Sequence, residues 1–204
     1  MEEDLLPWPQ SGDKLFEEGS DWWNNAVTDF RPGDWYPYVE GYRRAADVLV
    51  QHVAKHRSDT DLLVYPIAFL YRHYLELHLK TLIQEGSKLQ ESQPKPRHTH
   101  DLGQLWQECR SVLEGLSTQC PEADLDAVEA CIRELSEIDP RSMAFRYPVD
   151  KTGSPSCSQL GRVSLRQMAE VMARLAGLLD AIETEADLEL EFRQQMAAEY
   201  GDVF

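Results

Sequence analysis

Apolar residues recur mostly three and four positions apart along the chain, the spacing of helices that bury one face. The pattern predicts five main helices, over residues 38–57, 61–87, 102–116, 121–138 and 163–182. The last helix can extend to about Tyr200, Pro66 is expected near the first turns of the second helix or at a kink, and Gly86 at its end. No segment alternates as a strand does, so we expect an all-α bundle of five or six helices.

The first 34 residues lack this periodicity and place prolines and glycines between aromatic side chains such as Trp8, Trp22 and Trp23. We expect an irregular, aromatic-rich N-terminal arm that docks on the core through these rings. An aromatic platform for a ligand is the alternative. The expected organisation is an arm over 1–34, a helical bundle over 35–185 and an acidic C-terminal helix or tail over 186–204.

The net charge of −16 over 204 residues is concentrated at the two ends. Residues 1–21 hold seven acids against one lysine, and residues 180–204 hold eight acids against one arginine. This field disfavours nucleic acid, but the nearly balanced body leaves room for a local phosphate site. No apolar run reaches the roughly 20 residues of a membrane span, and the acidic start lacks a signal sequence. We expect a cytoplasmic protein without a membrane partner.

Cysteine and glycine patterns give no sign of a cofactor. The four cysteines are far apart in sequence, which favours structural thiols over a metal site or disulfides. Phosphate-loop, dinucleotide and Gly-x-Ser-x-Gly sequences are absent. The His98-x-His100-Asp101 segment could bind a metal by composition, but without a third ligand it is better explained as the start of a helix. We therefore expect neither a metal nor another cofactor.

The central helix carries the most distinctive polar residues. At about 100° per residue, Arg72, His73, Glu76 and Lys80 form one polar stripe, whereas His78 falls in the apolar sector. The stripe is either a buried structural network or a functional site built on one. His78 is either a neutral core histidine or a titratable group at a cleft or subunit interface. Partners for the stripe are expected from the two long loops: His100, Asp101, Asp139 and Arg146.

Three short elements resemble the HEPN superfamily. Residues 71–80, Tyr-Arg-His-Tyr-Leu-Glu-Leu-His-Leu-Lys, resemble a central HEPN helix. Residues 100–102, His-Asp-Leu, resemble the element that starts the next helix, and residues 145–148, Phe-Arg-Tyr-Pro, the element before the last helix. In this order they span roughly residues 38–182, and the resemblance implies a HEPN-like up-and-down bundle.

Many HEPN domains are metal-independent endoribonucleases with an Arg-x4-6-His motif, completed by dimerisation, in toxin–antitoxin or antiviral defence systems. By resemblance, Arg72 would bind the scissile phosphate and His78 would transfer a proton, with polar His73 beside them. The resemblance also implies a homodimer, an RNA substrate and a protein partner such as an antitoxin or nucleotidyltransferase. Glu76, Lys80 and the loop residues, Tyr147 included, would form the supporting network. The alternative is a non-catalytic helical binding or scaffold module that acts through dimerisation or a protein partner.

Overall fold

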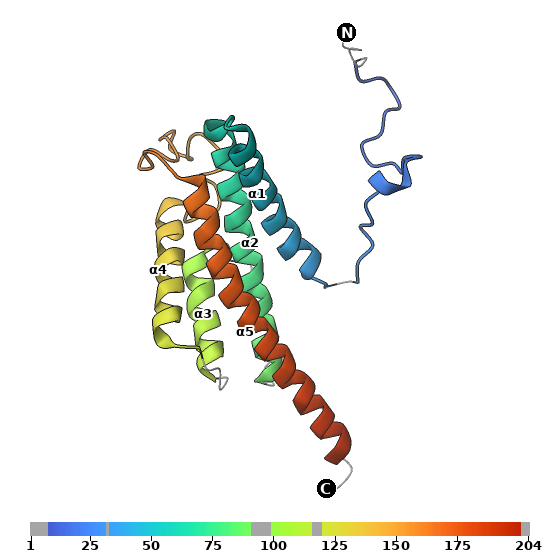
Figure 1. The fold of residues 1–204 in the computed structure, drawn as a ribbon, viewed down its shortest axis with the longest axis vertical. Helices are drawn as coiled ribbons and strands as arrows, with labels where there is room; N and C mark the ends of the chain where they lie inside the picture. The colour runs from blue at the N-terminus through green and yellow to red at the C-terminus, as the bar shows by residue number, and fades with distance from the viewer. Residues whose placement is uncertain (1–7, 32, 91–98, 116–119, 201–204) are drawn as a thin grey trace. The chain divides into compact units, whose positions relative to one another are not determined.

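The computed structural model describes residues 8–31, 33–90, 99–115 and 120–200. They form a short 3-10 helix, Trp22–Asn24, and five α-helices (Figure 1): α1 Tyr36–His56, α2 Thr60–Leu89, α3 Leu102–Gly115, α4 Glu122–Ile138 and α5 Leu165–Tyr200. Within this described part there is no strand, only an isolated bridge between Val149 and Pro155. The prediction of an all-α protein is confirmed. Most of the loop expected over 91–100 lies outside the described residues.

The chain divides into two compact units, residues 1–34 and residues 35–204. In the first unit, Trp22 and Trp23 meet edge to face, with ring centroids 6.1 Å apart. Docking of this unit on the helices stays a prediction. The second unit contains all five α-helices and therefore every candidate site residue of the central helix.

The middle position in the bundle belongs to α2, which packs against α1, α3 and α5, while α4 packs against α3 (Figure 1). Apolar side chains cover most of the circumference of α2, which suits a helix with neighbours on several sides. Ile67, Leu75 and Leu79 have at most 1% of their surface exposed. A charged group on such a helix is consequently enclosed unless a neighbouring helix leaves it open.

The order of helix directions differs from the expected up-and-down bundle. Residues 72 and 86 of α2 lie beside residues 100 and 112 respectively, so α2 and α3 run in the same direction. Contacts of residues 78 and 89 of α2 with residues 183 and 193 show that α5 also runs parallel to α2. The connection between α2 and α3 therefore returns the chain to the middle of α2, and this places His100 beside Arg72.

Gly86 does not end α2, contrary to the sequence-based expectation, because the helix continues to Leu89. A Cβ atom at Gly86 would overlap the Val112 side chain of α3. The glycine thus allows two helices to approach closely instead of capping one of them. Pro66 lies inside α2 near its beginning, as expected, and the helix runs through it.

All four cysteines are free thiols, so no disulfide joins the helices. Cys109 is fully buried, and burial raises the pKa of its thiol to about 12. Across the described residues, no helix has the length and apolar character to span a bilayer. α5 is the longest helix and runs on past the ends of the other helices (Figure 1).

Candidate functional site

Arg72, Glu76 and Lys80 are spaced four residues apart on α2, so their side chains project from one side of the helix. The Arg72 side chain is 0% exposed and that of Glu76 is 1% exposed, whereas Lys80 keeps 13%. Buried charges require oppositely charged or hydrogen-bonding partners. The elements packed around α2 supply these partners.

The Arg72 guanidinium joins three parts of the chain. Nη1 donates to Glu76 Oε2 at 3.2 Å, Nη2 to the His100 carbonyl at 2.8 Å, and Nε to the Asp139 carbonyl at 3.0 Å. Nε also lies 3.3 Å from Asp139 Oδ2. Burial lowers the pKa of Arg72, an effect that the Asp139 and Glu76 carboxylates oppose. Arg72 therefore ties α2 to the start of α3 and to the loop after α4.

Glu76 is the anionic centre of the network. Its Oε1 accepts a hydrogen bond from Lys80 Nζ at 2.8 Å and lies 2.7 Å from His100 Nδ1. Burial raises the pKa of Glu76, but the hydrogen bonds from Lys80 and His100 outweigh it, and the net pKa lies below its usual value. Because Glu76 is ionised, Nδ1 of His100 carries the proton of their bond.

The His100 imidazole is held by Glu76 through Nδ1, yet most of its side chain is exposed. Its side chain is 63% exposed, although the carboxylate that holds it is buried. Nε2 has no hydrogen-bond partner among the described residues. The backbone around it is also held, since Arg72 binds the His100 carbonyl. This is the arrangement that general acid–base catalysis requires of a histidine.

Asp139 stabilises the loop that follows α4. Its Oδ1 accepts hydrogen bonds from the backbone N–H groups of Met143 at 2.6 Å and Ala144 at 2.9 Å. Ser142, within this turn, has a left-handed backbone with φ of 57°. Asp139 therefore fixes the loop while it also faces Arg72, and we assign it a structural role.

The Phe69 ring contacts two further candidates, His73 of the stripe and Arg146 of the loop after α4. The ring stacks on His73 with centroids 5.7 Å apart, and the Arg146 guanidinium lies 5.5 Å from the ring centroid. His73 also meets the Tyr42 ring edge to face at 4.4 Å. Burial lowers the pKa of His73. Arg146 and Tyr147 are exposed and contact each other at 5.7 Å. His73 is thus packed among aromatic rings, whereas Arg146 is a surface cation.

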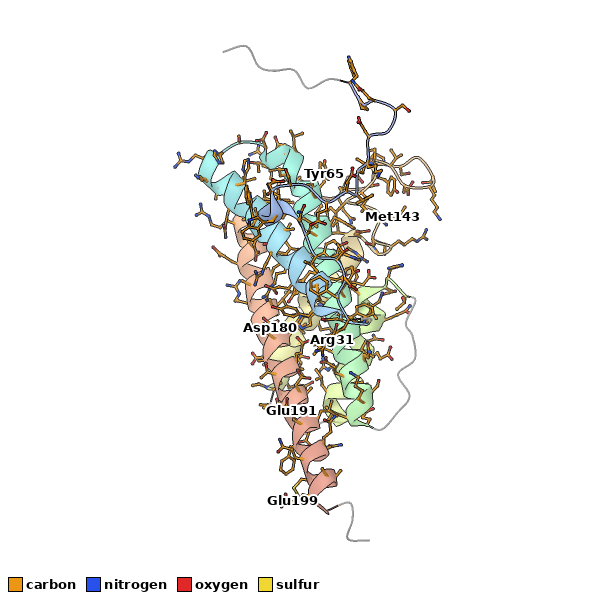
Figure 2. All side chains as sticks on the ribbon, turned by 90° about the vertical axis from the view of Figure 1, so that its right-hand side faces the viewer. Arg31, Tyr65, Met143, Asp180, Glu191 and Glu199 are labelled. Carbon is orange, nitrogen blue, oxygen red and sulfur yellow. The ribbon has the colours of Figure 1, made fainter. Side chains whose placement is uncertain are left out.

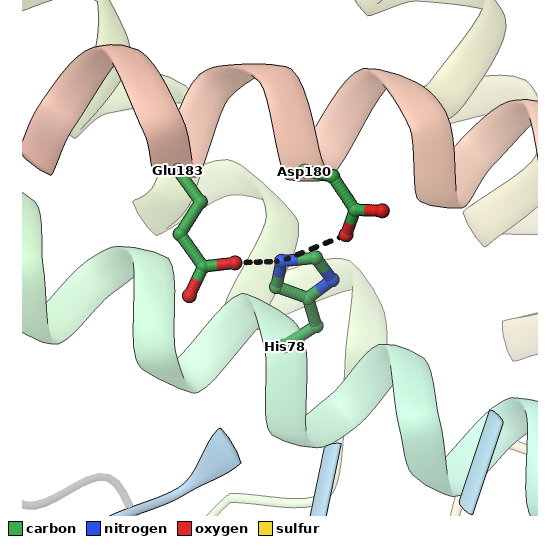
Figure 3. A group of neighbouring side chains, drawn as sticks. All are labelled: His78, Asp180 and Glu183. Carbon is green, nitrogen blue, oxygen red and sulfur yellow. Dashed lines mark hydrogen bonds and ion pairs between the residues drawn. The ribbon is translucent and has the colours of Figure 1, made fainter. Parts of the chain in front are cut away.

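His78 belongs to a separate cluster on the α5 side of α2 (Figure 3). The residue is 1% exposed. Nδ1 lies 3.0 Å from the Tyr74 hydroxyl, and Nε2 lies 3.0 Å from Glu183 Oε2 and 4.0 Å from Asp180 Oδ1. The other Asp180 oxygen accepts a hydrogen bond from Arg43 at 2.8 Å. Among the described residues, His78 therefore has no hydrogen bond or ion pair with the Arg72 network.

The structure brings together five of the expected residues: Arg72, Glu76, Lys80, His100 and Asp139. Asp101 lies beside them and caps α3, accepting a hydrogen bond from the Gln104 N–H at 3.1 Å. Sequence reasoning missed Asp180 and Glu183 as partners of His78. Their spacing of three residues on a helix is a visible signal, but nothing in the sequence assigns that helix face to α2.

Comparison of the chain with family models, with curated proteins and with solved structures gives no match.

Proposed function

We propose that the chain is a HEPN-like, metal-independent endoribonuclease whose proton-transfer group is His100. The observation that carries this proposal is the exposed imidazole of His100, held through Nδ1 by the buried Glu76 carboxylate. A carboxylate behind an imidazole orients the ring and stabilises the imidazolium that forms when it takes up a proton. The resemblance of residues 71–80, 100–102 and 145–148 to HEPN elements supports RNA as the substrate.

The chemistry uses only groups of this chain and of RNA. His100 Nε2 takes the proton of a ribose 2′-hydroxyl, and the 2′-oxygen attacks the adjacent phosphorus. The bond from phosphorus to the 5′-oxygen breaks, and this oxygen receives a proton from the His100 imidazolium through water, which yields a 5′-hydroxyl and restores the neutral imidazole. The other product end is a 2′,3′-cyclic phosphate. Lys80, which shares the Glu76 oxygen with His100, places a positive charge beside the reacting phosphate.

Arg72 and His78 have other roles in this proposal. The Arg72 guanidinium is fully buried and bonded to Glu76, His100 and Asp139, so a phosphate has no access to it. Arg72 acts as a positioning residue, because it binds both Glu76 and the backbone of His100. His78 is bonded within the α5 cluster and takes no part in the cleavage step.

Cleavage of a mixed RNA pool in EDTA tests the proposal. We expect products with 2′,3′-cyclic phosphate ends, and a loss of about 10²–10⁴-fold in kcat/KM for His100→Gln. His56→Gln changes an exposed imidazole of α1 and is the matched control, which should cleave like the wild type. His78→Gln should retain activity in the folded protein. Full activity of His100→Gln, or loss in His78→Gln alone, would contradict the assignment of His100.

A non-catalytic binding module is the second candidate function. Exposed apolar side chains in the C-terminal part of α5 favour it. Leu188, Phe192 and Met196 are 62%, 57% and 40% exposed and recur every four residues on one side of this helix. Acidic residues surround these three apolar side chains, and Figure 2 labels Glu191 and Glu199 on this part of α5. A second copy of this acidic segment would be repelled, so the chemistry fits a basic amphipathic helix of a protein partner.

Fluorescence anisotropy with a lysine–leucine amphipathic peptide tests this second candidate. We expect binding that is at least tenfold weaker for Phe192→Ser, with Val48→Ser, an exposed apolar residue of α1, as the control. A scrambled peptide of the same composition should bind more weakly than the amphipathic one. Equal binding of the two peptides would rule out helix recognition by the three apolar side chains of α5.

A further inference from the structure

We propose that His78, Asp180 and Glu183 form a binding site for a divalent transition-metal ion such as Zn²⁺, between α2 and α5. The three residues each offer one ligand atom, and these atoms all lie within 4.8 Å of one another (Figure 3). Imidazole together with carboxylates is a ligand set that zinc accepts. The site is separate from the Glu76–His100 pair and does not depend on ribonuclease activity.

The spacing of the ligand atoms is close to that of a tetrahedral centre. Bonds of about 2.0–2.1 Å place tetrahedral ligands about 3.3 Å apart. Nε2 of His78 lies 3.0 Å from Glu183 Oε2 and 4.0 Å from Asp180 Oδ1. The two carboxylate oxygens lie within 4.8 Å of each other, so the three ligand atoms must move closer together to bind one ion. Three protein ligands leave a fourth position for water, and the Asp180 and Glu183 side chains, 48% and 33% exposed, open it to solvent.

Neighbouring groups orient two of the three ligands. The Tyr74 hydroxyl lies 3.0 Å from Nδ1 of His78, so Nδ1–H can donate a hydrogen bond to it when the Nε2 lone pair binds the ion. Arg43 binds Asp180 Oδ2 at 2.8 Å and leaves Oδ1 on the His78 side. The buried imidazole is thus held by partners of the kind that support metal-binding histidines.

The charge around the cluster gives an independent reason for a cation. One turn beyond Glu183, the seam between α2 and α5 contains Asp187 of α5 and Glu85 of α2. Glu85 Oε2 is buried and has no hydrogen-bond partner among the described residues. A buried carboxylate oxygen without a partner beside further carboxylates is unfavourable. A divalent ion at the cluster reduces the repulsion along this seam.

Titration of the EDTA-treated, dialysed full chain with Co²⁺ and Zn²⁺ tests the site. We expect one Co²⁺ per chain with the intense visible absorption of four-coordinate cobalt, its displacement by Zn²⁺, and a rise in Tm with Zn²⁺. Asp180→Asn and Glu183→Gln should each weaken binding at least tenfold. Glu170→Gln, the same change at an exposed position of α5, should bind like the wild type.

A second set of variants separates this site from surface histidines. His52 and His56 lie one turn apart on α1, with ring centroids 4.5 Å apart, and could hold an ion adventitiously. We expect His56→Gln and His100→Gln to keep the stoichiometric site. Absence of stoichiometric binding, binding that survives both Asp180→Asn and Glu183→Gln, or binding lost only in His56→Gln would overturn the proposal. Glu183→Gln serves where a His78 variant fails to fold, because Glu183 is partly exposed.

Discussion

Glu76 and Glu85 lie on the same helix and are both largely enclosed, yet their carboxyl groups have opposite properties. At Glu76, hydrogen bonds from Lys80 and His100 outweigh burial and lower the pKa. At Glu85, burial raises the pKa to about 7, and the neighbouring Asp187 and Glu183 add to the rise. The pKa of Glu76 thus lies below its usual value, which favours the anion, whereas the raised pKa of Glu85 favours its protonated form.

The difference comes from the neighbours and not from α2 itself. On the side of α3 and the loop after α4, a buried carboxylate meets Arg72, Lys80 and His100. On the α5 side, the helix across the seam contributes further acids. One side therefore supports an organised acid–base pair, and the other has an excess of negative charge suited to a cation. The following predictions test this contrast, from the largest effect to the smallest.

Arg72→Ala should produce the largest loss of stability. It leaves the carboxylates of Glu76 and Asp139 buried with one cation fewer, at a cost of about 3–5 kcal/mol in the free energy of unfolding. Urea denaturation at pH 7 measures this loss. Arg166→Ala removes an exposed arginine of α5 and should cost less than about 0.5 kcal/mol. Equal losses in the free energy of unfolding for the two variants would contradict the burial of the Arg72 network.

Glu76→Gln should destabilise the protein by on the order of 2–3 kcal/mol at pH 7, because a neutral amide replaces the carboxylate that binds Lys80 and His100. The pKa of Glu76 is lowered in the folded state, so its contribution is complete above the ordinary carboxyl pKa and is lost as pH falls through the folded pKa. The free energies of unfolding of the two proteins should therefore approach each other as pH falls below the ordinary carboxyl pKa. A difference independent of pH would contradict the ionised state of Glu76.

Gly86→Ala should cost about 1–3 kcal/mol because the added methyl group overlaps Val112. Val112→Ala removes the overlapping atoms, so the double variant should recover part of the loss in a thermal melt. Gly177→Ala is the matched control, since a Cβ atom there meets nothing within 4 Å and alanine favours the helix. Equal melting temperatures of Gly86→Ala and Gly177→Ala would contradict the close approach of α2 and α3 at Gly86.

Glu85→Gln should stabilise the metal-free protein by about 1–2 kcal/mol at pH 8. The folded-state pKa, about 7, exceeds the ordinary value, so the folded protein binds the extra proton and wild-type stability falls as pH rises from about 4.5 to 7. Glutamine removes this loss, and the two proteins should be similar near pH 4. The measurement is urea denaturation in EDTA across this range. A variant less stable at pH 8 would indicate that the Glu85 carboxylate has a partner.

Several helix positions follow from local signals in the sequence. The periodic apolar residues predicted the bounds of all five α-helices to within a few residues, except at the C-terminal end of α5. There the pattern allowed the helix to end at about residue 182 or residue 200. The four-residue spacing of Arg72, Glu76 and Lys80 likewise placed them on one stripe, and their partner His100 was among the expected residues. These results depend on helix geometry alone, which is short-range.

Other features depended on packing between distant segments. The role of Gly86 was predicted wrongly: it was expected to end α2, but it allows a close approach to α3 that only the position of Val112 reveals. The partnership of His78 with Glu183 joins residues 105 positions apart. The parallel direction of α2 and α3 also lay beyond local pattern, since the periodicity of two helices does not state how their axes run relative to each other.

The sequence by itself determined the all-α class, the approximate helices and the polar stripe of the central helix, because each is set by the period and chemistry of neighbouring residues. The tertiary structure alone decided which stripe residues are accessible. In the packed fold Arg72 is buried, His100 is exposed beside buried Glu76, and His78 lies against two acids of α5. Burial and charge pairing depend on which helix faces which, and only the packed fold specifies this.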